Sequence, residues 1–362
     1  MRRRDLLTGA LVALSAGLVG HSVRADVDAL SQSEFDDWLA SMRPRALDAG
    51  VSGSTWESGL VGLAPDPVVI ARRAAAAETN QTITDYVLKL LNGRGKKART
   101  KFAAMPQLAE VEHRYGVPGG PLVAFWGMES DYGANIGDRD VLRATATHGA
   151  AGSSGTDWGA EFIAGLKILQ SGVVPRERLI GSYAGAVGQT QLMPTNYLRY
   201  AVDFDGDGRI DVWGTPLDAL ASAAVHLSKA AGWRQGESWL DETTLPSGFD
   251  LTKVEVEATA LTPVQWLSMG ATRTSGAPWS AADAAQSARL MLPAGIGGPA
   301  FLAFPNYQAF EAYNPSLAYA VGVSLLAKFT QGEEAIHKPW PTDTALARET
   351  RMAAQAGLAR LD

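Results

Sequence analysis

One carboxyl group in this chain has the surroundings of a general acid. Glu129 follows the almost wholly apolar run Leu122–Met128. An ionised carboxylate among such neighbours would lose hydration, so we expect the pKa of Glu129 to rise and its side chain to be protonated near neutral pH. The alternative is a structural glutamate at a helix end, capped by a neighbouring polar group. The local sequence leaves both interpretations open.

Asp131 is the obvious second carboxylate beside Glu129. On a helix, residues two apart point in different directions, so the two side chains are not expected to flank one scissile bond as the carboxylate pair of a glycosidase does. The sequence therefore predicts that Glu129 acts without a carboxylate partner.

A second candidate feature is the loop GSYAGAVGQTQLMPTNY at Gly181–Tyr197. Its glycines allow a bulky polar ligand to approach the backbone. Hydroxyls and amides suit sugar recognition, and the loop supplies them from Ser182, Gln189, Thr190, Gln191 and Asn196. The alternatives are a flexible surface loop or a simple helix entry at Met193–Pro194.

An acidic loop follows almost at once, DFDGDGRIDVW at Asp203–Trp213. Asp203, Asp205 and Asp207 with Gly208 match the first six positions of a calcium loop, and Arg209 would add its carbonyl oxygen. The usual glutamate of the twelfth position is missing, so the closing ligand must come from elsewhere, and Asp218 is the nearest candidate. The alternative is a solvated acidic turn.

Helical patterns dominate the elements that would position these groups. We expect a first helix with Ser33 as its N-cap and Asp36 as the acidic partner, and a second helical unit at Thr84–Asn92 ended by Gly93. The alternation in Lys253–Ala260 predicts a strand in a small mixed insertion. Further helices are expected at Gln107–Tyr115, Pro121–Tyr132, Ala160–Leu169, Pro216–Gly232, Tyr307–Tyr313 and Pro315–Lys328.

Composition excludes several classes of function. The 362 residues carry a formal net charge of −6 and no long Lys/Arg run, which argues against a nucleic-acid surface. Nothing indicates a nucleotide site, so no organic cofactor is expected. The chain has no cysteine, which excludes disulfides and thiolate chemistry, and its five histidines lack the spacing of a zinc site.

The N-terminal residues 1–25 have the pattern of an export signal. Arg2–Arg4 precede the apolar run Leu6–Gly20, which is short for a membrane span, and Val23–Ala25 offers a cleavage point near Ala25. The order Arg-Arg-Arg-Asp-Leu-Leu is similar to a twin-arginine signal. We therefore expect export to the periplasm without a stable membrane anchor. An uncleaved anchor is the alternative.

Taken together, the motifs resemble the lytic murein transglycosylase B family, glycoside hydrolase family 103. The likeness runs from about Ser33 to Lys328 and includes four motifs in the family's order. The first is FWGMESDYG at Phe125–Gly133, and the second is the loop Gly181–Tyr197. The third is the acidic loop together with DALASAA at Asp218–Ala224, and the fourth is YNPSLAYA at Tyr313–Ala320.

The resemblance implies a mainly α (α+β) fold, a lysozyme-like helical core with an accessory N-terminal helical domain and a small β-containing insertion. The expected boundaries are a helical domain at 26–107, the catalytic core at 108–245 with the calcium-type loop at 203–218, the insertion at 246–304, the completion of the core at 305–330 and a C-terminal tail at 331–362.

The implied reaction is non-hydrolytic cleavage of the β-1,4 bond between N-acetylmuramic acid (MurNAc) and N-acetylglucosamine (GlcNAc) in peptidoglycan, with a 1,6-anhydromuramoyl product. Glu129 would be the single acid/base. Positions that would line the glycan groove are Ser182, Gln191, Met193, Tyr313, Asn314 and Tyr86. A groove tyrosine of the family is replaced here by His226, which puts one sugar contact in doubt.

The family's calcium loop corresponds to Asp203, Asp205, Asp207, the Arg209 carbonyl and Asp218, which implies a structural Ca²⁺. Glycan strands of peptidoglycan are the expected partner, with cell-wall synthases as a further partner class and no nucleic acid. Two other functions stay open: a non-catalytic peptidoglycan-binding scaffold, and a lysozyme-type muramidase that hydrolyses the same bond.

Overall fold

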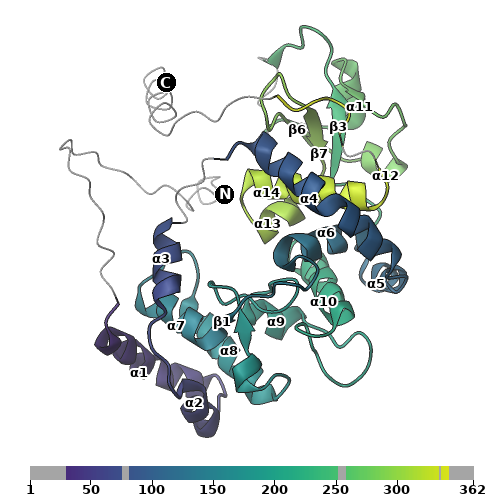
Figure 1. Cartoon of the computed structure of the whole chain (residues 1–362). Coiled ribbons are helices and arrows are strands. Elements are labelled where there is room, and N and C mark those ends of the chain that lie inside the picture. The colour runs from purple at the N-terminus through teal and green to yellow at the C-terminus, as the bar shows by residue number, and fades with distance from the viewer. Residues whose placement is uncertain (1–29, 76–80, 252–257, 334–335, 342–362) are drawn as a thin grey trace, which may run out of the picture. The chain divides into compact units, whose positions relative to one another are not determined.

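The computed structural model describes residues 30–75, 81–251, 258–333 and 336–341. The chain forms two compact units (Figure 1). Unit 1 contains residues up to Ala77 together with Asp138–Ala186, and unit 2 contains Glu78–Gly137 together with the chain from Val187 onward. The domain boundaries expected from the sequence remain a prediction, and the export signal lies outside the described residues.

Unit 1 is built from helices around aromatic contacts. Its helices are α1 (Gln32–Asp48), α2 (Gly53–Leu60), α3 (Pro67–Ala75), α7 (Val141–Ala150), α8 (Trp158–Ser171) and the 3₁₀ turn η1 (Arg176–Arg178). Strands β1 (Arg139–Asp140) and β2 (Ile180–Gly181) pair antiparallel. The fully buried Phe162 of α8 receives the edges of Trp38 and Trp56 at ring distances of 5.5 and 6.0 Å.

The start of α1 corrects the sequence prediction by two residues. Ser31, not Ser33, is the N-cap, and its hydroxyl accepts from the backbone N–H of Glu34 at 3.2 Å. The Glu34 carboxylate in turn accepts from the backbone N–H of Ser31 at 2.9 Å. This reciprocal capping box satisfies two N–H groups at once, whereas the predicted pair of Ser33 and Asp36 places both residues inside the helix.

Unit 2 surrounds one apolar helix, α6 (Gly119–Ser130). Ten of its residues are buried, from Gly119 to Gly127 and at Ser130. Helices α4 (Ile83–Ala103), α5 (Leu108–Tyr115), α10 (Pro216–Lys229) and α14 (Leu317–Thr330) all contact it. Figure 1 shows α4 and α14 beside it. The remaining helices of the described part of this unit are α9 (Pro194–Tyr200), α11 (Pro263–Ser268), α12 (Ala281–Ala284) and α13 (Tyr307–Tyr313).

The prediction that Gly93 ends a helix is wrong, because α4 continues for ten residues beyond it, to Ala103. Packing explains the difference at Gly95, where an added Cβ would lie only 2.7 Å from the ring of Phe329. The missing side chain therefore lets α4 lie close to the end of α14. Tertiary contact of this kind overrides the weak helix propensity of glycine.

A five-stranded antiparallel sheet lies between α10 and α13 in the sequence, in the order β4-β6-β7-β3-β5. Its strands are β3 (Leu240–Thr244), β4 (Ala260–Leu261), β5 (Thr272–Arg273), β6 (Ala288–Met291) and β7 (Ala300–Ala303). Of the strand predicted at Lys253–Ala260, residues 253–257 lie outside the described residues, and Ala260 begins β4. The fully buried Trp266 of α11 donates its indole N–H to the carbonyl of Ala288 at 2.9 Å.

A buried ion network joins this sheet to α14. Asp241 of β3 is paired with Lys328 of α14 at 2.9 Å and with Arg273 of β5 at 3.1 Å. The Lys328 and Asp241 side chains are 8% and 5% exposed. Removing Asp241 would take the shared carboxylate away from Arg273 and from the largely buried Lys328 amine, which is destabilising. The network therefore fixes the sheet against the helix that also carries Tyr319.

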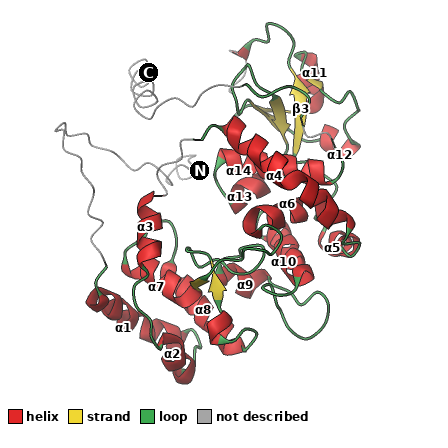
Figure 2. Ribbon diagram, viewed as in Figure 1, coloured by secondary structure: helices red, strands yellow, loops and turns green. Residues whose placement is uncertain are grey.

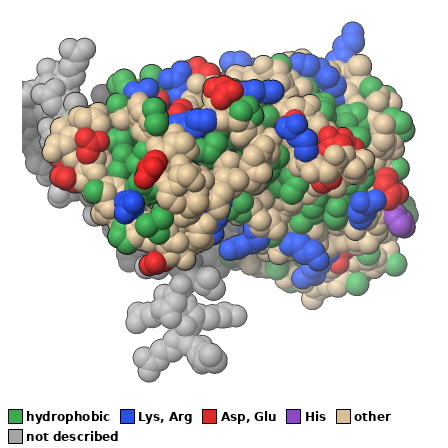
Figure 3. Space-filling model, turned by 90° about the horizontal axis from the view of Figure 1, so that it is seen from below, with side chains coloured by type: hydrophobic (Ala, Val, Ile, Leu, Met, Phe, Trp, Pro, Cys, Tyr) green, Lys and Arg blue, Asp and Glu red, His purple; other side chains and the backbone are tan. Residues whose placement is uncertain are grey.

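The described structure is mainly helical, as predicted, with one five-stranded sheet and one short two-stranded pair (Figure 2). Among the described residues, no helix is both long and apolar enough to cross a membrane. On the face in Figure 3, basic side chains lie among acidic ones rather than in a separate field. A single continuous basic field, the usual mark of a nucleic-acid surface, is not seen on that face.

Candidate active site

Glu129 lies in the last turn of α6, and the chain turns sharply just after it. Asp131 and Tyr132 both adopt the left-handed conformation, with φ of 51° and 62°. The N–H groups of Asp131 and Tyr132 bond back to the carbonyls of Gly127 and Trp126, each at 3.2 Å. Gly127 is required here, because an added Cβ would lie 2.5 Å from the Tyr132 ring. The end of α6 is thus fixed by its own residues.

The Glu129 carboxyl group is held in a partly buried, hydrogen-bonded position. The hydroxyl of Tyr319 from α14 donates a short hydrogen bond to Oε1 of Glu129. Burial raises the pKa of Glu129 to about 7, although the Tyr319 hydrogen bond acts in the opposite direction. Near neutral pH a substantial fraction of this group is protonated. The rise in pKa agrees with the expectation drawn from the apolar run before it.

Three tyrosine hydroxyls lie close enough to Glu129 for its charge to change their pKa. Burial and then the negative charge of Glu129 raise the pKa of Tyr86, Tyr313 and Tyr319. The Tyr313 ring stacks on Phe125 at 4.3 Å, and its hydroxyl donates to the carbonyl of Thr190. These tyrosines therefore surround the carboxyl group with neutral hydroxyls rather than with charges.

No second carboxylate acts on Glu129 within the described residues. Its pKa responds to burial and to Tyr319, and no other acidic side chain contributes. The Asp131 carboxylate is turned to Lys97, with which it forms an exposed ion pair at 2.9 Å. The geometry agrees with the expectation that the two acids do not form a catalytic pair.

The loop that carries Gln191 is rigid at its centre. Gln189 is buried, accepts from the indole of Trp126 at 2.8 Å and donates to the carbonyl of Trp213 at 3.2 Å. Its own carbonyl accepts from the Ser130 hydroxyl at 2.6 Å, which ties the loop to the end of α6. This network argues against a flexible surface loop. Gln189 is therefore a structural residue of the site.

Gln191 itself has a positive φ of 52°, an uncommon conformation for a residue with a side chain. Its side-chain amide donates to the carbonyls of Ile136 at 3.1 Å and Gly188 at 2.8 Å. Met193 follows as the N-cap of α9 and is half-buried. The backbone bridge between Val187 and Leu192 closes the loop.

The predicted groove residue Asn314 lies next to Tyr313, as does His226, which replaces a groove tyrosine of the family. Asn314 is the C-cap of α13, and its side-chain oxygen accepts from the backbone N–H of Ser316 at 3.0 Å. His226 from α10 meets the Tyr313 ring edge-on at 5.6 Å, and burial lowers its pKa. Tyr86 contributes from α4, with its hydroxyl 3.8 Å from the sulfur of Met128. Unit 2 therefore brings Tyr86, Tyr313 and Tyr319 to the same carboxyl group.

Ser182 belongs to unit 1, whereas Glu129 belongs to unit 2. The Ser182 hydroxyl accepts from the backbone N–H of Ala186 at 3.2 Å, and its own N–H donates to the Ala186 carbonyl at 2.9 Å. Ser182 is thus part of a tight turn. Its role in glycan binding remains a prediction.

The acidic loop brings three of its carboxylates together. Oxygen atoms of Asp203, Asp205 and Asp218 lie within 4.8 Å of one another. Asp207 lies outside this group, and its carboxylate accepts from the backbone N–H of Arg209 at 2.8 Å. Asp207 and the Arg209 carbonyl remain predicted ligands.

Asp218 gives the strongest indication that the loop fits a cation. It is 1% exposed and receives backbone N–H groups from Phe204 at 2.8 Å and Asp211 at 2.9 Å. Burial still raises the pKa of this carboxyl group, since it outweighs the effect of both hydrogen bonds. The negative charge of Asp218 is therefore costly where it lies. A hard divalent cation, which prefers oxygen ligands, would compensate it.

Comparison with known proteins identifies the family. The Transglycosylase SLT domain family model matches residues 34–328. The chain belongs to this family. The match covers both units and includes the end of α6, the Gln191 loop and the acidic loop. The family resemblance drawn from the sequence motifs is confirmed.

Three relatives illustrate the likeness. The membrane-bound lytic murein transglycosylase B of Escherichia coli K12 is 33% identical over 222 residues, which are 58% of this chain but only 56% of that protein. SltB3 of Pseudomonas aeruginosa, solved with NAG-anhNAM-pentapeptide, is 40% identical, with a TM-score of 0.82 over 90% of this chain and 87% of its own. Slt35 of E. coli, solved with calcium, is 24% identical, with a TM-score of 0.66 over 84% of this chain and 94% of its own.

The structural likeness to these lytic transglycosylases confirms the predicted fold class. At 24% identity, Slt35 supports the fold alone, so its calcium says nothing directly about this chain.

Sequence reasoning missed the part played by Tyr319. Tyr319 lies within the motif Tyr313–Ala320, but the sequence motif alone assigns it no chemical role. A local signal existed, because a tyrosine near the start of an otherwise apolar helix needs a partner for its hydroxyl once it is buried. Which group would meet it depended on the packing of α14 against α6, which the sequence does not specify.

Proposed function

We propose that this chain is a lytic transglycosylase that cleaves the β-1,4 bond between MurNAc and GlcNAc of peptidoglycan and forms 1,6-anhydromuramoyl ends. The observation that carries the proposal is the isolated Glu129, partly buried and hydrogen-bonded only to Tyr319 among the described side chains. Family membership and the 40% identical SltB3 structures, solved with NAG-anhNAM-pentapeptide and with NAG-NAM-pentapeptide, support the same substrate class.

In the proposed reaction Glu129 acts twice. Its protonated carboxyl group donates a proton to the glycosidic oxygen, and the bond from that oxygen to C1 of MurNAc breaks. The resulting carboxylate then accepts the proton of the MurNAc C6 hydroxyl while O6 forms a bond to C1. The proton returns to Glu129, and no water is consumed. A two-carboxylate hydrolase would instead need a partner about 5–10 Å away.

The groove is proposed to include Tyr86, Gln191, Met193, Tyr313 and Asn314 of unit 2. Ser182 of unit 1 stays a predicted glycan contact. Tyrosine faces and a rigid amide loop suit sugar rings, because rings stack on aromatic faces while amides pair with hydroxyls. Cell-wall synthases remain a proposed partner class. We also propose a periplasmic location, reached through the export signal expected at residues 1–25, and cell fractionation checks it.

Product analysis tests the proposal. Purified sacculi digested with the protein should release fragments with anhydro ends, each lighter by one water than the corresponding reducing fragments, by mass spectrometry. Reducing ends without anhydro products would instead identify a muramidase. Sacculus binding without release of soluble fragments would identify a scaffold protein.

The acidic loop is proposed to hold a structural Ca²⁺ through Asp203, Asp205 and Asp218, with Asp207 and the Arg209 carbonyl as further ligands. We expect saturating Ca²⁺ to stabilise the folded protein by about 3 kcal/mol at a hundredfold excess over Kd, which raises Tm by several degrees. Thermal unfolding with Ca²⁺ and with chelator measures the difference.

Asp205→Asn is the test variant for this site, because Asp205 is exposed and its loss should disturb little else. We expect it to reduce the Ca²⁺ response strongly. Asp37→Asn on α1 removes the same charge from an exposed helix and should leave the response unchanged. A Tm that ignores both Ca²⁺ and chelator in the unsubstituted protein would rule out the site.

A further inference from the structure

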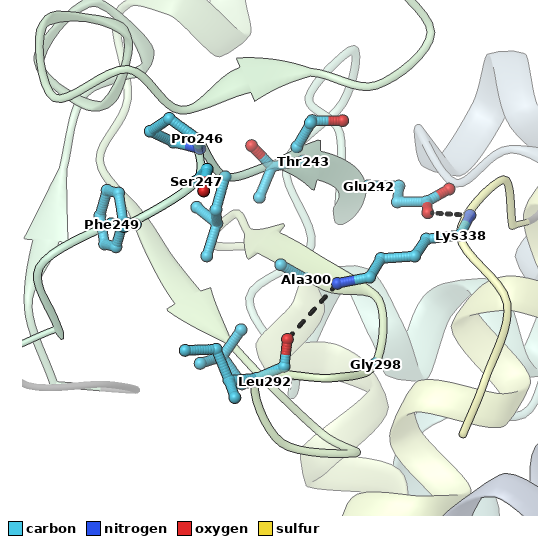
Figure 4. Close-up of a pocket in the computed structure, with 13 residues that line it drawn as sticks. Glu242, Thr243, Pro246, Ser247, Phe249, Leu292, Gly298, Ala300 and Lys338 are labelled. Atoms are coloured by element: carbon cyan, nitrogen blue, oxygen red, sulfur yellow. Dashed lines mark hydrogen bonds between the residues drawn. The ribbon is translucent and has the colours of Figure 1, made fainter. Parts of the chain in front are cut away.

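A cavity of about 380 Å³ lies at one end of the five-stranded sheet, far along the chain from Glu129. Its wall is formed by the end of β3 at Thr244, the start of β7 at Ala300 and the turn that follows β6. Figure 4 shows Phe249, Pro246 and Leu292 around it. This volume is within the range of small-molecule sites, roughly 300–1,000 Å³.

A nearly buried carboxylate holds the backbone of Lys338 in place beside this cavity. Glu242 of β3, with a side chain 7% exposed, accepts from the backbone N–H groups of His337 at 2.6 Å and Lys338 at 2.8 Å. Nδ1 of His337 lies 3.0 Å from the same carboxylate. These contacts hold segment 336–341 against the sheet. Trp340 is buried further along the same segment, with its ring 6.4 Å from that of Phe301.

The Lys338 side chain is exposed and extends along the cavity wall (Figure 4). Nζ donates to the carbonyl of Ile296 at 3.4 Å, a long hydrogen bond. Within the described part of the chain, Lys338 forms no ion pair, and the Glu242 carboxylate is engaged by backbone groups and His337. The amine is therefore available to a negatively charged ligand.

The rest of the lining favours a peptide over a sugar. Leu245, Pro246, Phe249, Leu292, Ile296 and Ala300 provide apolar surface. The hydroxyl of Thr243 already donates to Thr272 at 2.9 Å, and that of Thr244 lies 3.0 Å from Thr274. Among the described residues that line the cavity there is no asparagine or glutamine, so few side chains remain to pair with sugar hydroxyls. A peptide ligand with small apolar side chains and one free carboxylate therefore matches this wall better than a sugar does.

We propose that this cavity is a second binding site, which takes a short peptide of small apolar residues through its free terminal carboxylate at Lys338. The carboxylate pairs with Nζ, while methyl-sized side chains lie against Phe249 and Leu292. The site uses none of the residues assigned to catalysis. Its existence does not depend on the proposed reaction.

Calorimetric titration of the full chain with N-acetyl-trialanine, in the L and the D form, tests the proposal. We expect saturable binding of at least one isomer with Kd on the order of 0.1–1 mM. The matching C-terminal amide should bind roughly tenfold more weakly, because it lacks the charge. The preferred isomer identifies the source, D for peptides of the cell wall and L for peptides released from proteins.

Two variants place the ligand in this cavity. Lys338→Met should weaken binding roughly tenfold, whereas Lys89→Met, a matched exposed lysine on α4, should not change it. Ser247→Trp on the exposed rim should abolish binding by filling the entrance. An unchanged Tm confirms that each variant is folded. Equal affinity for acid and amide, or no binding of either isomer, would overturn the proposal.

Discussion

Glu129→Gln is expected to reduce the release of soluble muropeptides from sacculi by about 10³-fold while the protein stays folded. An amide has nearly the shape of the carboxyl group but cannot donate a proton to the leaving oxygen, and a general acid contributes typically 10²–10⁴-fold. The loss should exceed the lower limit of that range, because the same group also serves as the base. Initial rates on purified sacculi measure the effect.

Asp131→Asn is the matched control for this variant. It makes the same chemical change two residues later, at an exposed carboxylate whose visible role is the ion pair with Lys97. Asparagine also tolerates the left-handed conformation that Asp131 adopts. We expect Asp131→Asn to keep most of the activity and the Tm of both variants to stay close to that of the parent. Substantial turnover by Glu129→Gln would show that the acid has been assigned wrongly.

The nature of Glu129 could be predicted from the sequence because its cause is local. A run of apolar residues before a carboxyl group forces a burial cost whichever helices cover it, and the raised pKa follows. The helix Tyr307–Tyr313 was predicted with its observed bounds for a similar reason, since the apolar periodicity and its flanking residues agree. Local patterns of this kind need no knowledge of the rest of the fold.

Features that depend on distant segments could not be predicted. Gly93 has the local character of a helix end, yet α4 continues because Gly95 accommodates Phe329 from more than two hundred residues away. Tyr319 meets Glu129 for the same kind of reason, since the two residues are 190 positions apart. The acidic loop depends partly on local sequence and partly on distant contacts. Its motif was recognisable, but the structure determines which carboxylates converge, and these are Asp203, Asp205 and Asp218.

The isolation of Glu129 also gives a specific pH dependence. Its carboxyl group must be protonated to act as the acid, and burial raises its pKa to about 7. We therefore expect kcat/KM to be level below that pH and to fall about tenfold per pH unit above it, because kcat/KM follows the ionisation of the free enzyme. Rates on soluble glycan strands from pH 5 to about 9 define this limb.

Tyr319→Phe should move that limb to higher pH, by about one unit. The Tyr319 hydroxyl stabilises the ionised carboxylate, and a hydrogen bond to a charged group is worth about 1.5–3 kcal/mol, of which 1.36 kcal/mol corresponds to one pKa unit. Tyr86→Phe is the control, because its hydroxyl meets the sulfur of Met128 rather than the carboxylate. A limb that stays in place for Tyr319→Phe, or moves equally for both variants, would contradict the assignment of Tyr319. If the limb shifts for Tyr319 alone, a neutral hydroxyl sets the working pH of an acid that has no carboxylate partner.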